Sequence, residues 1–235
     1  MHDKSKSLVV ANLWVAFAAF FVAIILGLYQ VMNRSGLFPE IESHELYFAS
    51  VSTHGVLMGF VLTTFFIMGF GYYTATSTLK RELWSRGLAW VAFSIALGGT
   101  VMAAIPLLTG KASVLYTFYP PLMAHPTFYI GATLLVVGSW LWCLEMIMST
   151  VTWKRDNPGK VVPLAMYGTT ANAIMWLWTS AGVGIEMLFQ LIPWSLGLMD
   201  TLDPGLARTL FSWTLHAIVY FWLFPAYIAM YTILP

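Results

Sequence analysis

This sequence contains few charged residues. Asp, Glu, Lys and Arg make up only 9% of its 235 residues, whereas hydrophobic residues make up 59%. In a typical soluble domain about a quarter of the residues are charged, so this chain cannot cover the surface of a soluble particle of its size. An aromatic content of 16%, with 11 Trp, suits a protein that meets two water–lipid boundaries. The composition excludes a soluble protein and predicts a multi-pass protein of the lipid bilayer.

Cysteine is nearly absent as well. The single Cys143 excludes an internal disulfide and a cysteine-based metal cluster. A net charge of +1 offers no basic surface, so nucleic acid is not an expected partner. We find no glycine-rich phosphate loop, no Ser/His/Asp set and no paired carboxylates of a hydrolase. Metal chemistry, if present, must rest on the five histidines.

Six apolar runs are long enough to cross a bilayer, which takes about 20 residues at a rise of 1.5 Å. They lie at about 8–32, 46–76, 83–108, 121–150, 162–192 and 206–234. We therefore predict an all-α, polytopic transmembrane helical bundle over residues 1–235, with no soluble domain. The sixth run reaches Pro235 without the polar flank that normally anchors a spanning helix. This ending predicts that the chain is a fragment.

The connections predict the orientation of the chain. Eight of the 11 positive residues lie before the first run, after the second and after the fourth: Lys4, Lys6, Lys80, Arg81, Arg86, Lys154, Arg155 and Lys160. The other three connections hold one positive residue each, and they carry Glu40, Glu42, Glu45, Asp200 and Asp203. Positively charged loops stay on the cytoplasmic side, so the N-terminus is predicted to be cytoplasmic.

His54 lies inside the second run, about eight residues from its outer end. An ionisable group within the membrane is costly, and its default interpretation is a functional role. Gly55 and Gly59 are four residues apart and leave one side of that helix without side chains. A flat, bulky group or a neighbouring helix can therefore come close. Two interpretations stay open: a helix contact with a hydrogen-bonded histidine, or an axial haem ligand, which a neutral imidazole suits.

His216 lies inside the sixth run, about ten residues from its outer end, and Tyr220, Tyr227 and Tyr231 follow it at offsets of 4, 11 and 15. At about 100° per residue, the four side chains fall within roughly 60° of one another. An interfacial aromatic belt explains Tyr231 but not Tyr220, which is far from either boundary. A buried file of hydroxyls leading to a metal-type ligand indicates a proton path. Pro225 is expected to kink the helix along it.

The other histidines and buried carboxylates receive no chemistry. His2, at the start of the chain, and His44, in an acidic outer loop, are interpreted as solvated. His125 is interpreted as a helix-start histidine near the headgroups or a polar cofactor substituent. Glu186 is expected to pair with a group from another helix, and Glu145 to reach water at the cytoplasmic end.

Four segments carry a resemblance to a known family: residues 53–57, 114–122, 157–161 and 216–220, the last joined by Tyr227 and Tyr231. Together they resemble subunit I of a haem–copper oxygen reductase, most closely the B family, the ba-type cytochrome c oxidases. The likeness runs over the whole chain. It covers only the first six helices of a subunit that has twelve or more in the family, in agreement with the abrupt ending at Pro235.

The resemblance implies a role for each matched residue. His54 resembles an axial ligand of the low-spin haem, of b type, and His216 a ligand of the copper beside a high-spin haem of a type or a related one. Tyr220 resembles the catalytic tyrosine that is covalently linked to that histidine. Tyr227 and Tyr231 match proton-pathway tyrosines.

Two neighbouring positions refine the resemblance. The residue after the copper histidine is usually proline and here is Ala217, which puts the backbone shape around the copper in doubt. Ile218 stands where the A family commonly has the glutamate of a second proton channel, so a single proton pathway is implied. Related nitric oxide reductases have a glutamate at the position of Tyr220, and the tyrosine therefore favours oxygen.

The implied function is that of part of the catalytic subunit of a terminal oxidase in a prokaryotic plasma membrane. It would reduce oxygen to water with electrons from cytochrome c and take up or pump protons. Its partners would be the remainder of subunit I, which carries the other metal ligands, and a subunit II with a binuclear copper centre docked over the acidic outer loops and Trp194. No candidate among His2, His44 and His125 is placed to supply the missing ligands.

Three alternatives stay open. Nitric oxide reduction belongs to the same superfamily. A di-haem electron-transfer subunit would not need the tyrosine file beside His216. A transporter or a purely structural subunit is the third, although a transporter would favour broken, charged helices at the midplane.

Overall fold

The computed structural model describes residues 3–36 and 44–234, and this part of the chain is helical without strands. Six of its helical segments are long and apolar enough to cross a membrane, as expected for an all-α membrane protein. The elements are α1 (Asp3–Arg34), α2 (His44–Val56), η1 (Leu57–Leu62), α3 (Thr63–Thr78), α4 (Arg86–Leu108), α5 (Pro126–Asp156), α6 (Leu164–Glu186), η2 (Met187–Leu191), α7 (Ile192–Ser195) and α8 (Pro204–Ile233). His2, Glu40 and Glu42 lie outside the described residues.

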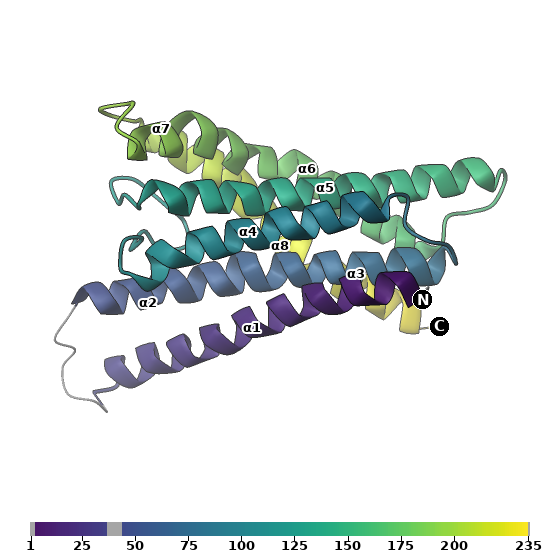
Figure 1. Ribbon diagram of the computed structural model, residues 1–235, viewed down its shortest axis with the longest axis horizontal. Helices are drawn as coiled ribbons and strands as arrows, with labels where there is room; N and C mark the ends of the chain where they lie inside the picture. Colours follow the sequence, from purple (N-terminus) through teal and green to yellow (C-terminus); the bar gives the residue numbers. More distant parts are fainter. Residues whose placement is uncertain (1–2, 37–43, 235) are drawn as a thin grey trace.

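The six spans run up and down in chain order, and the start of α1 and the end of α8 lie at the same end of the bundle (Figure 1). Each predicted apolar run overlaps one span, with bounds that differ by a few residues. The second span consists of α2, η1 and α3, and the fifth of α6, η2 and α7, because a π-helical stretch interrupts each one without breaking it. A single π-turn adds one residue to a helix and often marks a functional site. The apolar pattern did not predict either interruption.

The fourth span begins at Pro126, five residues later than the predicted start at 121. His125 is the N-cap, and its imidazole accepts a hydrogen bond from the backbone N–H of Thr127 at 3.4 Å. Proline suits the first helical position because its missing N–H would have no partner there. The interpretation of His125 as a helix-start histidine is therefore confirmed.

The helices approach most closely where glycines face one another. A Cβ atom added to Gly131 of α5 would lie 2.5 Å from the carbonyl oxygen of Gly99 in α4, so neither position accommodates a side chain. Small residues at such contacts let helix backbones meet in a membrane, where apolar burial alone does not drive association. Between single elements, the contact of α4 with α5 is the most extensive, and that of α6 with α8 follows.

Glu145 differs from the expectation, because it is fully buried and does not reach water. The loop between α3 and α4 folds back over the end of α5, and the backbone N–H of Ser85 donates to both Glu145 carboxylate oxygens at 3.1 Å. The hydroxyl of Ser149 donates to the same carboxylate at 3.1 Å. Glu145 thus ties the loop to α5, and its role here is structural.

Candidate functional site

His54 is half-buried on α2, and its ring is held by α1. Its Nδ1 atom lies 2.8 Å from the carbonyl oxygen of Ala23. A carbonyl only accepts hydrogen bonds, so Nδ1 carries the proton and the lone pair of the imidazole is on Nε2. Histidines that bind metals are commonly oriented in this way, with one ring N–H donating to a carbonyl and the other nitrogen free for the metal.

Gly27 of α1 completes the support of this ring. A Cβ atom at Gly27 would lie 2.9 Å from Cε1 of His54, so the imidazole fits against α1 only because position 27 has no side chain. One turn further along α1, the amide of Gln30 donates to the carbonyl of Ser50 at 3.0 Å and fixes α1 against α2. Gly27, Ala23 and Gln30 were not found from the sequence.

The glycine stripe beside His54 is occupied only in part. A Cβ atom at Gly55 would lie 2.9 Å from Cβ of Tyr116, whereas one at Gly59 would come no closer than 3.8 Å to the ring of Trp222. The Nε1 atom of Trp222 is buried and has no hydrogen-bond partner among the described residues. A methyl group at position 59 would therefore make only ordinary van der Waals contact with Trp222, whereas one at position 55 would require a shift of Tyr116.

His216 and Tyr220 lie together on an exposed face of α8. Their rings are 6.0 Å apart between centroids, at an interplanar angle of 59°. Both line a shallow, open hollow with Ser212, Leu215 and Val219. Neither side chain has a hydrogen bond within the described structure, and Tyr220 is 48% exposed. The imidazole, the phenol and the hollow therefore face outward from the bundle.

Tyr227 and Tyr231 continue the same exposed side of α8 toward its C-terminal end, and both line a second groove that includes Tyr167 of α6. The file of four residues thus lies on one side of the helix, but it is exposed and not buried as the sequence suggested. The physical reason is that α6 packs on the opposite side of α8, which carries the buried residues Phe211, Thr214, Ile218, Phe221 and Pro225.

The remaining candidates do not join these groups. His44 begins α2 and is exposed. Both carboxylate oxygens of the fully buried Glu186 lack a hydrogen-bond partner among the described residues, so the expected pairing with another helix is not formed there. Within residues 3–36 and 44–234, no three His, Cys, Asp or Glu residues gather into a metal-binding group. His54 and His216 are therefore separate candidate ligands.

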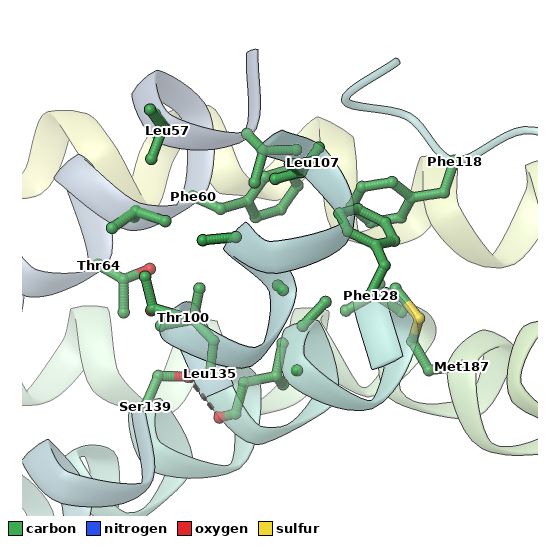
Figure 2. A pocket seen from close by; sticks show the side chains of 18 of the residues that line it. Leu57, Phe60, Thr64, Thr100, Leu107, Phe118, Phe128, Leu135, Ser139 and Met187 are labelled. Atoms are coloured by element: carbon green, nitrogen blue, oxygen red, sulfur yellow. Dashed lines mark hydrogen bonds between the residues drawn. The ribbon is translucent and has the colours of Figure 1, made fainter. Parts of the chain in front are cut away.

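A cavity of about 40 Å³ lies among η1, α4, α5 and α6, and neither His54 nor His216 lines it (Figure 2). Its wall is almost entirely apolar, with Phe60, Phe118, Phe128 and Leu135 around it. The hydroxyl of Ser139 at its edge already donates to the carbonyl of Val136 at 2.6 Å. An apolar void of this kind has no partners for a polar substrate, so we do not place the chemistry here.

The comparisons with known proteins agree on one family. Residues 7–235 match the family model for cytochrome c and quinol oxidase polypeptide I. The chain belongs to this family. It is 40% identical over 230 residues to cytochrome c oxidase subunit 1 of Thermus thermophilus, an alignment that covers 94% of this chain and 40% of that protein. A solved haem–copper terminal oxidase dimer matches with a TM-score of 0.93 and 42% identity, over 98% of this chain and 40% of its own.

Membership of the oxidase polypeptide I family confirms the resemblance to subunit I of haem–copper oxygen reductases. The chain spans about 40% of the length of the relatives that it matches. The family implies haem and copper as cofactors. The finer assignment to the B family and the roles of His54, His216, Tyr220, Tyr227 and Tyr231 stay predictions.

Proposed function

We propose that this chain forms part of the catalytic subunit of a terminal oxidase, which reduces oxygen to water with electrons from cytochrome c. The observation that carries the proposal is the pairing of His216 with Tyr220, an imidazole and a phenol one turn apart beside an open hollow on α8. A structural helix needs neither group on its exposed side, whereas oxygen reduction needs a metal ligand and a proton donor at one place.

His54 would hold the iron of a low-spin haem, of b type, through Nε2, because its Nδ1 proton is directed to the carbonyl of Ala23. His216 is the proposed copper ligand beside a high-spin haem of a type or a related one, and the remainder of subunit I supplies the other ligands. When bound, the haems and the copper carry electrons to oxygen. The residues of this chain hold the two imidazoles and supply protons.

Tyr220 is the proposed catalytic residue. Its phenol, one turn from His216, can release a proton and an electron to the oxygen substrate. Tyr227 and Tyr231 lie further along the same side of α8 and are proposed to lead protons from the cytoplasm to Tyr220. Ile218 is buried and has no acidic group, which supports a single pathway.

The proposed location is a prokaryotic plasma membrane, with the N-terminus in the cytoplasm because the positive residues favour that side. His54 lies ten residues after the start of α2, and His216 twelve after the start of α8, about 15 and 18 Å along their helices. Both then lie in the outer half of their spans, which are 35 and 30 residues long. Electrons would arrive from outside, through a subunit II with a binuclear copper centre that docks near Trp194 of α7. Protons would enter from the opposite side, so the reaction would separate charge.

A redox spectrum of the purified, complete complex tests this proposal. We expect low-spin and high-spin haem bands, copper in the metal analysis, and a change in the high-spin band when carbon monoxide is added to the reduced protein. Oxygen consumption with reduced cytochrome c should accompany these signals. Absence of haem bands would eliminate every redox function, and rapid nitric oxide reduction with negligible oxygen reduction would favour the nitric oxide reductase alternative.

A further inference from the structure

The side of α8 opposite His216 and Tyr220 is joined to α6 at two buried contacts, which comprise three hydrogen bonds. The first comes from Thr214, which is 1% exposed. Its hydroxyl donates to the carbonyl of Thr179 at 2.8 Å and accepts from the backbone N–H of Val183 at 2.9 Å. In a regular α-helix these two backbone groups of α6 would bond to each other. The hydroxyl of α8 therefore enters the backbone ladder of α6.

Gly182 makes this close approach possible. A Cβ atom at Gly182 would lie 2.5 Å from the carbonyl oxygen of Leu210 and 3.0 Å from the Thr214 hydroxyl. The two backbones therefore meet at the level of Thr214, and a larger residue at 182 would push α8 away. A side chain inserted into a helix ladder is a recognised cause of local bending, so a substitution at this contact is expected to alter α6 as well as α8.

The second contact comes from Asn172 of α6, which is 2% exposed. Its Nδ2 atom donates to the carbonyl of Phe221 at 3.2 Å. That carbonyl would normally accept from the N–H four residues later, but residue 225 is proline and has none. Asn172 thus supplies the donor that Pro225 removes. The rings of Trp176 and Phe221 stack beside it, with centroids 4.3 Å apart and planes 12° from parallel.

These two contacts lie on either side, along the chain, of the segment that carries the proposed chemistry. Thr214 precedes His216 by two residues, and Phe221 follows Tyr220 by one. A shift of α8 by one residue would turn its side chains by about 100° and move them by about 1.5 Å. The hydrogen bonds of Thr214 and Asn172 would then be broken. We propose that Thr214 and Asn172 are positioning residues, which set the rotation and height of α8 and so hold His216 and Tyr220 in place. The proposal rests on the proposed function of those two residues.

The first test replaces Thr214 in the complete oxidase complex. Thr214→Val keeps the shape of the side chain and removes the hydroxyl, whereas Thr214→Ser keeps the hydroxyl. We expect Thr214→Val to shift and broaden the infrared band of carbon monoxide bound to copper, to lower the copper content, and to reduce turnover between about ten- and a hundredfold. Thr214→Ser should restore all three. The low-spin haem band should stay at the parent level, because His54 is held by α1.

Thr209→Val is the matched control. Thr209 lies on the same helix, is exposed, and bonds only within α8, to the carbonyl of Gly205 at 2.8 Å. This substitution should leave the copper and its carbon monoxide band unchanged. Equal losses from Thr209→Val and Thr214→Val would overturn the proposal, as would a uniform loss of copper and low-spin haem in Thr214→Val and Thr214→Ser alike.

The second test uses the coupling between Asn172 and Pro225. Asn172→Leu leaves the Phe221 carbonyl buried without a donor, and Pro225→Ala restores the missing N–H. We expect the carbon monoxide band to be displaced strongly by Asn172→Leu and much less by Asn172→Leu with Pro225→Ala. Equal displacement in both backgrounds would overturn the proposal.

The two proposals fail in different ways. A parent complex without haem and copper would overturn the proposed function and this inference with it. A parent that contains both, in which Thr214→Val leaves the carbon monoxide band unmoved, would overturn this inference alone.

Discussion

The surroundings of His54 and His216 differ in how much of the support comes from this chain. His54 is enclosed by a second helix, which accepts the proton of Nδ1 at Ala23 and leaves room for the ring at Gly27. Among the described residues His216 has no such partner, and its ring faces an open hollow beside Tyr220. The orientation of the His54 imidazole is therefore set by direct contact with α1. That of the His216 imidazole depends on the contacts that α6 makes with the opposite side of α8.

Removing the ligand on the enclosed side should have the largest effect. His54→Leu deletes the proposed axial nitrogen, so we expect complete loss of the low-spin haem band and of turnover in the complete complex. The six-helix topology should survive, because helix packing rests on other contacts, such as that of Gly99 with Gly131. Haem analysis and circular dichroism of the purified protein check both parts. Unchanged haem content would contradict the assignment of His54 as a haem ligand.

On the exposed side, Tyr220→Phe should abolish turnover while both haems and the copper remain. The substitution removes one hydroxyl and keeps the ring, so metal binding at His216 is preserved and only proton and electron donation is lost. Oxygen consumption, metal analysis and the carbon monoxide difference spectrum distinguish these effects. Val219→Ala, a neighbour in the same hollow, is the control and should retain turnover. Reduction of oxygen to water at the parent rate by Tyr220→Phe would contradict the role proposed for this helix.

A smaller loss is expected further along the same face. Tyr231→Phe and Tyr227→Phe should each slow proton-coupled steps by about tenfold, without changing the metals, because water can replace part of a broken chain of hydroxyls. Time-resolved proton uptake measures this directly. Tyr73→Phe, an exposed tyrosine of α3 on another helix, should have no effect. If Tyr227→Phe and Tyr231→Phe both take up protons at the parent rate, the pathway does not follow α8.

The contrast between the two histidines also marks how far sequence reasoning reached. The spans and the two deep histidines could be predicted, because an apolar run of bilayer length and an ionisable group inside it are local signals. The support of His54 could not, since Ala23 and Gly27 belong to another helix and Gly27 lies in no recognisable pattern. Glu145 was misplaced for a similar reason: its position near a helix end suggested water, but the loop that buries it folds back from α3.

The burial of Tyr220 was misjudged because helical periodicity gives the side that a residue shares with others and not which side the neighbouring helix covers. Here the covered side of α8 is the one where Gly182 of α6 allows a close approach and the Thr214 hydroxyl bonds to α6. Thr214 and Asn172 read as ordinary polar residues of apolar helices, and only their contacts with backbone atoms of α6 and α8 reveal which side of α8 is buried.

The finest test alters the support of His54 by one methyl group. A Cβ atom at Gly27 would lie 2.9 Å from Cε1 of the imidazole, closer than real Cβ contacts come, so in Gly27→Ala the ring or α1 must shift. The low-spin haem should still bind, because Nε2 remains available. Its absorption band and midpoint potential should move, and turnover should fall by less than about tenfold, since outer contacts tune a metal site without forming it.

Gly98→Ala in α4 is the matched control, because a Cβ at that position would meet nothing within 4 Å beyond the local backbone of its own helix. It should leave the haem band and the potential at their parent values. The copper–carbon monoxide band should stay unmoved in both variants, since position 27 contacts His54 and α1 is not among the helices that pack extensively on α8. A shift of the copper signal in Gly27→Ala would show that the two histidines are not supported independently, and the contrast between an enclosed and an open ligand would then fail.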